Sequence, residues 1–267
     1  MKNNSNGFLW AGGIISALML GIIILGFFWT PYDPNAMDAK AKFTAPCLQH
    51  LLGTDNFGRD IFSRVVAGAG ASFFIALCVV AIGCVSGIII GGLCGYYGGL
   101  PDLILTRVCD SITAFPAFLL ALVIVSVAGP GTENIIIALG ILFIPSFARI
   151  VRSEFARCRD MNYIKSARLM GAGGLRIMLR HILPNTFPVL LSAVTIGFNN
   201  AVLSEASMSF LGIGIQPPYA SLGSLISDSQ SFLNSAPWYA LGTGAVIALL
   251  ILGFSLLSEG LQMKGHR

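Results

Sequence analysis

The chain alternates long apolar stretches with shorter polar segments. Six stretches are long enough, or nearly long enough, to cross a hydrocarbon core, which takes about 20 apolar residues in a helix. The stretches cover residues 8–29, 71–96, 104–128, 134–151, 186–212 and 238–258. Because a backbone in lipid must satisfy its own hydrogen bonds, the pattern predicts an all-α polytopic membrane protein with about six transmembrane helices.

Composition supports a membrane protein over a soluble one. Charged residues make up 10% of the chain and hydrophobic residues 55%, and the mean hydropathy is +0.80. Soluble domains carry about a quarter charged residues. The first stretch exceeds the roughly 7–15 apolar residues of a signal-peptide core. We therefore predict that residues 1–30 form a retained N-terminal transmembrane helix.

The basic residues predict the orientation, because cytoplasmic loops are enriched in Lys and Arg. Four of the sixteen basic residues share the segment 31–70 with four aspartates, which makes that segment neutral. We predict that this segment is extracytoplasmic and that both termini, including the tail 262–267, are cytoplasmic. The twelve basic residues on the predicted cytoplasmic side are Lys2, Arg107, Arg149, Arg152, Arg157, Arg159, Lys165, Arg168, Arg176, Arg180, Lys264 and Arg267.

The extracytoplasmic segment 31–70 has a helical pattern near its end. Thr54 or Asp55 can cap a helix there. Two acid–base pairs, Asp55 with Arg59 and Asp60 with Arg64, have the i,i+4 spacing of one helix face. The apolar residues Phe57, Ile61, Phe62 and Val65 occupy another face. We predict an amphipathic helix at the outer membrane interface.

The segment 149–184 is too long for a simple connection between two spans. Asn162 can cap a short helix that ends before Gly171, a residue suited to a left-handed position. A second short helix is predicted to end at Pro184. Its apolar face consists of Leu175, Met178, Leu179 and Ile182. Two interpretations stay open on spacing alone: a basic connection lying on anionic lipid, or a helix–turn–helix that docks a cytoplasmic partner, with Ser166 and Ala167 permitting close approach.

Several motifs carry a family resemblance. Lys165-Ser166-Ala167, followed by Gly171 and later by Leu183-Pro184, resembles the EAA loop of binding-protein-dependent ABC importer permeases. From about Pro31 to Leu261 the chain resembles the C-type permease subunit of the dipeptide/oligopeptide/nickel family. The other matching segments are His50 to Arg64, Phe115-Pro116, Gly129 to Gly131, Arg180 to Asn185, Glu205 to Gly214, Gln216 to Pro218 and Ser235 to Trp238.

The resemblance implies a fold and a function. The fold would be that of type I ABC importer permeases, with one N-terminal helix and a five-helix core over residues 71–261. The chain would form half of a translocation pathway for di- or oligopeptides, with a nickel or metal-chelate importer of the same family as the alternative. Its partners would be a second (B-type) permease, two ATP-binding cassette ATPases, an extracytoplasmic substrate-binding protein and membrane lipid, in the cell membrane of a prokaryote.

The resemblance also implies which residues receive the energy of ATP hydrolysis. In that family the EAA segment is a coupling helix seated on the ATPase. The corresponding residues are Tyr163, Lys165, Ser166, Ala167, Arg168, Met170 and Gly171. This chain departs from the pattern because Lys165 replaces the glutamate and Ser166 the first alanine, which removes the polar contact that a glutamate would make.

We expect this chain to catalyse no reaction itself. It has no GxxxxGK[ST] sequence for ATP phosphates and no GxSxG elbow, and His50, His181 and His266 lie outside the apolar stretches. The six cysteines show neither a CxxC pair nor a His/Cys cluster. We therefore expect no catalytic residues, no metal site, no cofactor bound by this chain and no nucleic-acid partner.

The candidates for the translocation path are polar residues within or beside the apolar stretches. Asn199, Asn200 and Glu205 are the first choice, and Asp110 is weaker because Arg107 is close in the sequence. Interhelical hydrogen bonding by the two asparagines is the competing interpretation. A secondary transporter is the functional alternative from another class. It would carry ionisable groups near mid-membrane, whereas the acids here lie near the predicted span ends.

Overall fold

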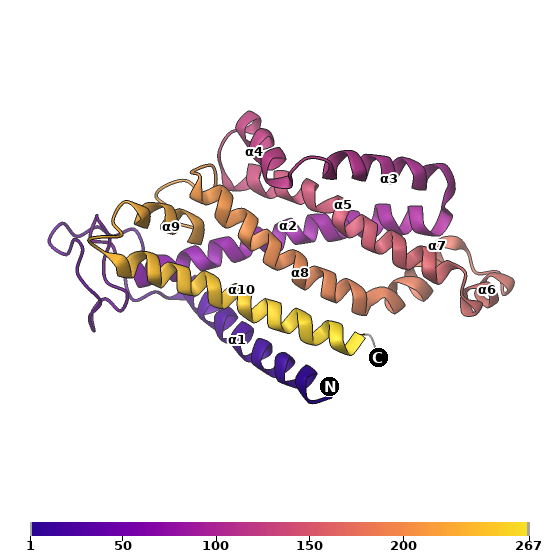
Figure 1. Ribbon diagram of the computed structural model, residues 1–267, viewed down its shortest axis with the longest axis horizontal. Helices are drawn as coiled ribbons and strands as arrows, with labels where there is room; N and C mark the ends of the chain where they lie inside the picture. The colour runs from indigo at the N-terminus through magenta and orange to yellow at the C-terminus, as the bar shows by residue number, and fades with distance from the viewer. Residues whose placement is uncertain (1, 266–267) are drawn as a thin grey trace.

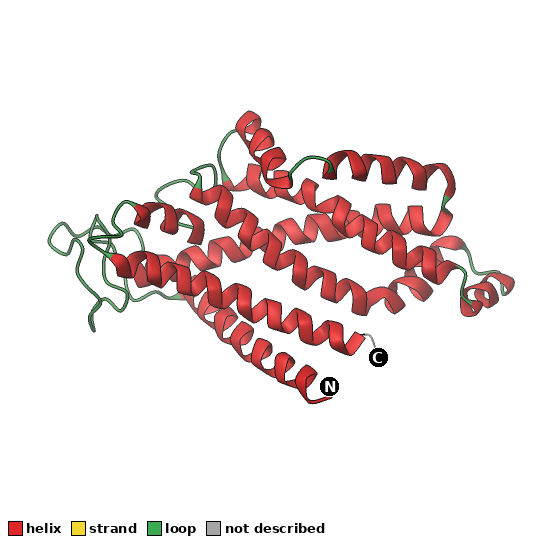
Figure 2. Cartoon of the chain, viewed as in Figure 1, coloured by secondary structure: helices red, strands yellow, loops and turns green. Residues whose placement is uncertain are grey.

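The computed structural model describes residues 2–265 as an elongated bundle of helices (Figures 1 and 2). Within these residues the only strand-like pairing is an isolated bridge between Thr54 and Asp60. The elements are α1 (Lys2–Phe28), α2 (Ile61–Tyr97), α3 (Gly99–Thr113), α4 (Ala117–Ala128), α5 (Thr132–Arg159), α6 (Asn162–Leu169), α7 (Gly174–Ile177), the π-helical turn η1 (Met178–Ile182), α8 (Leu183–Phe210), α9 (Leu222–Gln230) and α10 (Pro237–Gly265). The all-α prediction is confirmed.

Five helices are long and apolar enough to cross a membrane: α1, α2, α5, the continuous run α7–η1–α8, and α10. The predicted third span, 104–128, is wrong as a single helix. It is divided into α3 and α4, which meet at 85°. Pro116 cannot donate a backbone hydrogen bond, and it disfavours helical geometry at Phe115. If the bent pair counts as one span, the number of spans is six.

Glycine-mediated contact brings α2 and α5 together as the most extensively packed helix pair. Side chains added at Gly87, Gly91 and Gly95, four residues apart on α2, would overlap Phe147, Ala148 and Arg152 of α5. Small residues at this spacing allow two backbones to approach closely in a lipid environment. The α2–α5 pair is the centre of the bundle, with α8 on one side of it. α1 packs mainly along α10, so the first and last helices are neighbours (Figure 1).

The two ends of the bundle differ. Residues 29–60 form a long non-helical segment at one end, which we call the loop end, and α6 lies at the opposite tip, the α6 end (Figure 1). Both marked termini lie away from the loop end (Figure 1). The last described part of the predicted tail continues α10 to Gly265, whereas residues 266–267 lie outside the described residues.

The amphipathic helix expected from Thr54 onward is not formed, and residues 61–70 belong to α2. The Asp55 carboxylate accepts hydrogen bonds from the backbone N–H groups of Phe57 (2.8 Å) and Arg59 (2.9 Å). Such local bonds compete with helix formation. Gly58 lies at φ 74°, which interrupts the helical path further. The helix starts only at Ile61, where Asp60 accepts a hydrogen bond from Ser63 N at 2.8 Å and caps α2.

The second predicted cytoplasmic helix does not end at Pro184. α7, η1 and α8 are continuous, and Pro184 lies in the first turn of α8, where its missing N–H is tolerated. The π-helical turn shifts the register of the apolar face. Leu175 and Leu179, predicted to be on that face, are therefore exposed, while Met178, Ile182 and also Ile177 are buried.

Candidate functional site

The α6 helix is held against the bundle by two of its residues. Ile164 and Ala167, three residues apart on one face, are 0% and 4% exposed. They belong to a small apolar cluster formed with α2, α5, η1 and α8, which includes Tyr96, Phe155 and Ile182. This cluster is separate from the main core of the bundle. α6 is therefore positioned as a rigid attachment, although it lies at the very tip (Figure 1).

The opposite face of α6 is exposed, with no buried contact among residues 2–265. Leu169 and Met170 are 89% and 82% exposed, and they are accompanied by the exposed residues Lys165 and Ser166. Apolar side chains so exposed at the tip of a protein are typical of a contact with another molecule. We call Lys165, Ser166, Leu169 and Met170 the α6 crest.

The turn after α6 has the predicted geometry. Gly171 adopts φ 83°, its N–H donates to Arg168 O at 2.9 Å, and the Ala172 N–H donates to Ala167 O at 3.0 Å. These two bonds define a Schellman motif. The start of α6 differs from the prediction, because Met161 is the N-cap residue and Asn162 is the first residue of the helix.

The structure divides the seven predicted coupling residues into outward and inward groups. Ala167 faces the bundle, so the expectation that it opens the backbone to a partner is wrong. The Arg168 guanidinium lies 5.2 Å from the centre of the Tyr96 ring, a cation–π contact back to α2. The Asn185 side-chain amide donates to the Tyr163 hydroxyl at 3.4 Å, and partial burial raises the pKa of Tyr163. Lys165, Ser166, Met170 and Gly171 are outward.

The three translocation-path candidates on α8 have different surroundings. The Asn199 side chain donates to Ser255 Oγ at 2.9 Å, which joins α8 to α10 as the hydrogen-bonding interpretation expected. Glu205 is fully buried and accepts a hydrogen bond from Ser209 Oγ at 2.6 Å. Asn200 is exposed and lines a hollow of about 300 Å³ together with Ile196. A second hollow, of about 490 Å³, is lined by both Asn199 and Asn200, but Asn199 is only 8% exposed, so Asn200 is the more open of the two.

Asp110, the weaker candidate, lies on α3 and faces away from the core. Its carboxylate pairs with Arg149 of α5 at 3.4 Å, and both side chains are more than half exposed. α3 is also tied to α5 by the ion pair between Asp102 and Arg152. These exposed pairs contribute little stability individually. They favour an attachment of the bent segment to α5 over a role of Asp110 in a pore.

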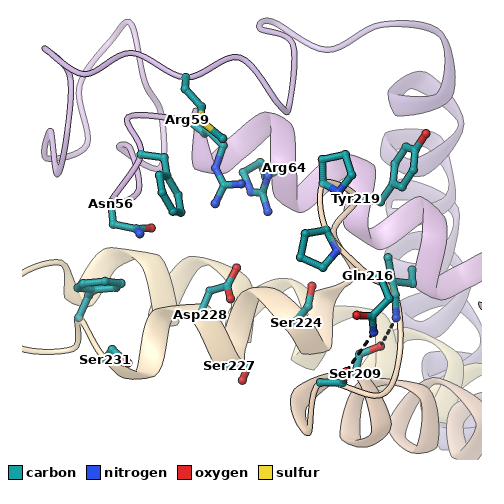
Figure 3. Close-up of a pocket in the computed structure, with 17 residues that line it drawn as sticks. Asn56, Arg59, Arg64, Ser209, Gln216, Tyr219, Ser224, Ser227, Asp228 and Ser231 are labelled. Atoms are coloured by element: carbon teal, nitrogen blue, oxygen red, sulfur yellow. Dashed lines mark hydrogen bonds between the residues drawn. The ribbon is translucent and has the colours of Figure 1, made fainter. Parts of the chain in front are cut away.

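A cavity of about 800 Å³ lies at the loop end (Figure 3). No sequence pattern predicted it. Its walls come from the segment before α2, from the start of α2, from the turn between α8 and α9, and from α9. Arg59 and Arg64 lie on one wall, and Asp228 of α9 points towards them from the other (Figure 3). Partial burial raises the pKa of Asp228, while Arg64 and Arg59 lower it.

The arginine wall is organised by one buried carboxylate. Asp55, fully enclosed, binds Arg59 Nε at 2.6 Å and lies 3.9 Å from Arg64 Nε. The predicted Asp60–Arg64 pair is not formed; Asp60 contacts His50 Nδ1 at 2.9 Å instead. The motif from His50 to Arg64 was a signal for this wall, but Asp228 is far away in the sequence. Only the fold brings the two walls together.

Other chemistry is sparse in the part of the chain that the structure describes. No group of three or more His, Cys, Asp or Glu side chains there could hold a metal ion. The six cysteines are free thiols. The features that stand out are therefore an exposed crest at one end, a polar position on α8, and a charged cavity at the other end.

A bundle of apolar helices with an exposed short helix at one tip is an arrangement typical of transport permeases. The chain belongs to the family of binding-protein-dependent transport system inner membrane components, whose profile matches residues 87–263. It is a permease of an ABC importer and a multi-pass membrane protein. The secondary-transporter alternative is wrong.

Individual relatives cover most of the chain. A Brucella suis biovar 1 protein, provisionally named a peptide transport system permease protein, is 42% identical over 252 residues, which is 93% of this chain and 85% of the relative. The dipeptide transport system permease protein DppC of Alkalihalophilus pseudofirmus is 39% identical and covers 93% and 83%. The glutathione transport system permease protein GsiD of Pectobacterium atrosepticum is 37% identical and covers 94% and 84%.

A solved structure supports the fold. The crystal structure of an amino acid ABC transporter with histidines aligns with a TM-score of 0.59 at 20% identity, covering 77% of this chain and 94% of that chain. At this identity the likeness concerns the arrangement of helices only. It confirms the predicted ABC importer permease fold.

Proposed function

We propose that this chain forms half of the translocation pathway of an ATP-driven importer of peptides, together with a second (B-type) permease. Two ATP-binding cassette ATPases would supply the energy, and an extracytoplasmic binding protein would deliver the substrate. The observation that carries the proposal is the α6 crest, an exposed apolar surface on a helix rigidly attached to the bundle.

The proposed mechanism is mechanical. A helix locked by Ile164, Ala167 and the Gly171 turn can transmit a displacement to α5 and α8, because packed elements move as rigid bodies. A mobile loop in the same place would absorb the displacement. The chain has no phosphate-binding GxxxxGK[ST] sequence, which supports placing ATP hydrolysis in separate subunits. Lys165, in place of a glutamate, gives the crest a positive charge that would favour an acidic groove on the ATPase.

The α6 end is proposed to be cytoplasmic, and the loop end extracytoplasmic. Exposed basic residues are concentrated near α6, for example Arg176 and Arg180 beside Lys165 and Arg168. At the loop end, Arg59 and Arg64 are buried beside Asp55. The positive-inside rule supports this orientation, which also places both termini in the cytoplasm.

Peptides are the proposed substrate class because the relatives named above are permeases of peptide, dipeptide and glutathione systems. None of these three relatives is named for nickel, so the metal alternative has less support.

Within the membrane, we assign Asn200 to the translocation path, because an exposed amide on a membrane span needs a polar partner or a water-filled cavity. Asn199 and Glu205 would act in helix packing.

The proposal is tested by co-purification. Tagged full-length chain is expressed with the neighbouring permease and ATPase genes and extracted in mild detergent. Leu169→Asp should abolish recovery of the ATPases because a carboxylate replaces an apolar contact at the crest. The matched control is Leu48→Asp at the loop end, where a leucine is 99% exposed; it should retain them. Wild-type chain that supports uptake without any ATPase would overturn the proposal.

A further inference from the structure

The loop-end cavity contains charge that the proposed coupling mechanism does not use. Its volume of about 800 Å³ is within the roughly 300–1,000 Å³ range of small-molecule sites. Charged residues inside a membrane protein are costly and usually have a partner or a function. The charges on its two walls therefore need an explanation.

The arginine wall presents unused hydrogen-bond donors. The Nε of Arg59 donates a hydrogen bond to Asp55. Neither terminal nitrogen of Arg59 has a hydrogen bond among residues 2–265. Arg64 donates Nη1 to Pro34 O at 3.2 Å, while its Nε is buried without a partner. These side chains are 9% and 3% exposed, respectively. Two nearly buried guanidinium groups with free donors match the planar, two-oxygen geometry of a carboxylate.

The opposite wall presents the complementary charge. Asp228 on α9 points into the cavity towards the two arginines (Figure 3). Among the described residues its carboxylate forms no ion pair, because Asp55 is the acid that binds the arginines. Asn56 and Ser227 also line the cavity, and both are labelled in Figure 3. Asn56 lies on the side of the arginines, whereas Ser227 lies next to Asp228 on α9 with its hydroxyl pointing away from the arginines (Figure 3).

We infer that this cavity binds a short peptide with free termini, its carboxylate on Arg59 and Arg64 and its ammonium group near Asp228. The arrangement separates a positive and a negative wall across a space of molecular size, which suits a zwitterion better than a simple anion. The side-chain amide of Asn56, which also lines the cavity, can meet a peptide amide. The inference rests on the proposed function for its substrate class and adds a receiving site in the permease itself.

The experiment measures binding without transport. Full-length chain in lipid nanodiscs is titrated with trialanine, N-acetyl-trialanine and trialanine amide by ligand-observed NMR. For the wild type, removing either terminal charge should weaken binding by about tenfold, as expected for a charge-assisted hydrogen bond. In Asp228→Asn, N-acetylation should cost less than about twofold, because the partner of the ammonium group is already absent.

A second variant tests the other wall. In Arg64→Gln, amidation should weaken binding clearly less than in the wild type, because only Arg59 remains for the carboxylate, while N-acetylation keeps its full effect. Asp33→Asn is the control, since Asp33 is an exposed acid of the same loop segment that does not line the cavity. If Arg64→Gln does not fold, the comparison of wild type with Asp228→Asn is decisive. Asp228 is exposed on α9, so its replacement should not disturb folding.

Two results of the peptide comparison, and one of the titration itself, would overturn the inference. One is equal binding of free and capped peptides to the wild type; the other is an N-acetylation penalty that survives in Asp228→Asn. Absence of trialanine binding up to millimolar concentration would also overturn it. Co-purification of the ATPases is scored separately: if they assemble but the cavity binds no peptide, only this inference fails, and if peptide binds but no ATPase assembles, the proposed function fails.

Discussion

The two ends of this permease are built on opposite principles. At the α6 end a short regular helix is attached by apolar side chains and exposes Leu169 and Met170. At the loop end an irregular segment is organised around the buried Asp55 and encloses its charges in a cavity. An exposed apolar surface suits a permanent protein partner, whereas enclosed charge suits a small polar ligand. The difference supports the two proposals made above, an ATPase contact at the α6 end and a peptide site at the loop end.

The largest effect should come from the charged end. Asp55→Ala leaves Arg59 and Arg64 without their buried counter-ion, and breaking such a pair costs about 3–5 kcal/mol. We expect a large fall in the thermal transition of the purified protein in detergent. Asp33→Ala removes an exposed acid with one local bond, from Asn35 N, and should change stability by at most about 0.5 kcal/mol. Equal effects of the two variants would refute the organising role of Asp55.

The apolar attachment of α6 should respond next. Ile164→Ala removes buried methyl groups and should cost about 2–4 kcal/mol, mostly as local opening of α6. Hydrogen exchange of the α6 amides should accelerate while exchange in α2 stays unchanged. Leu169→Ala on the exposed face of the same helix should leave exchange nearly unaltered. If both variants exchange alike, α6 is not anchored by Ile164.

The smallest predicted change in stability concerns the turn after α6. Gly171→Val forces a β-branched residue to φ 83° and should cost about 1–3 kcal/mol of local strain. It should uncouple ATP hydrolysis from uptake while membrane insertion is retained. Gly173→Val is the matched control, because Gly173 lies at φ −69° and ψ 157°, which valine adopts readily, and a Cβ meets no atom within 4 Å at either position. Normal coupled uptake by Gly171→Val would contradict a role of the turn.

Three local predictions were wrong in whole or in part because the sequence pattern fits more than one backbone conformation. The predicted helix from Thr54 failed because the i,i+4 spacing of Asp55 and Arg59 fits a turn as well as a helix; the ion pair forms at 2.6 Å, but in a turn. The predicted apolar face of the second loop helix was right for Met178 and Ile182 but wrong for Leu175 and Leu179, because a π-helical turn shifts its register. The third span bends at Pro116, a breaker that the apolar run around it concealed.

The candidate site was predicted only in part, because some of its features are local and others depend on contacts between helices. The Gly171 turn follows from its own residue type, since glycine tolerates the left-handed region. That Ala167 faces inward depends on where α6 meets Tyr96 and Phe155, which lie on other helices. Which of Asn199, Asn200 and Glu205 is open to a cavity depends on the rotation of α8 against its neighbours.

The order of residues was enough to predict the class of molecule. It shows an apolar chain with polar interruptions that must cross a membrane as helices, a left-handed glycine turn, and an ordered set of family motifs. These are properties of single residues or of neighbours along the chain. The bend between α3 and α4, the inward face of α6, and the meeting of Arg59 and Arg64 with Asp228 across a cavity became visible only in the folded chain. Such contacts join residues distant in the chain, and packing rather than local propensity selects them.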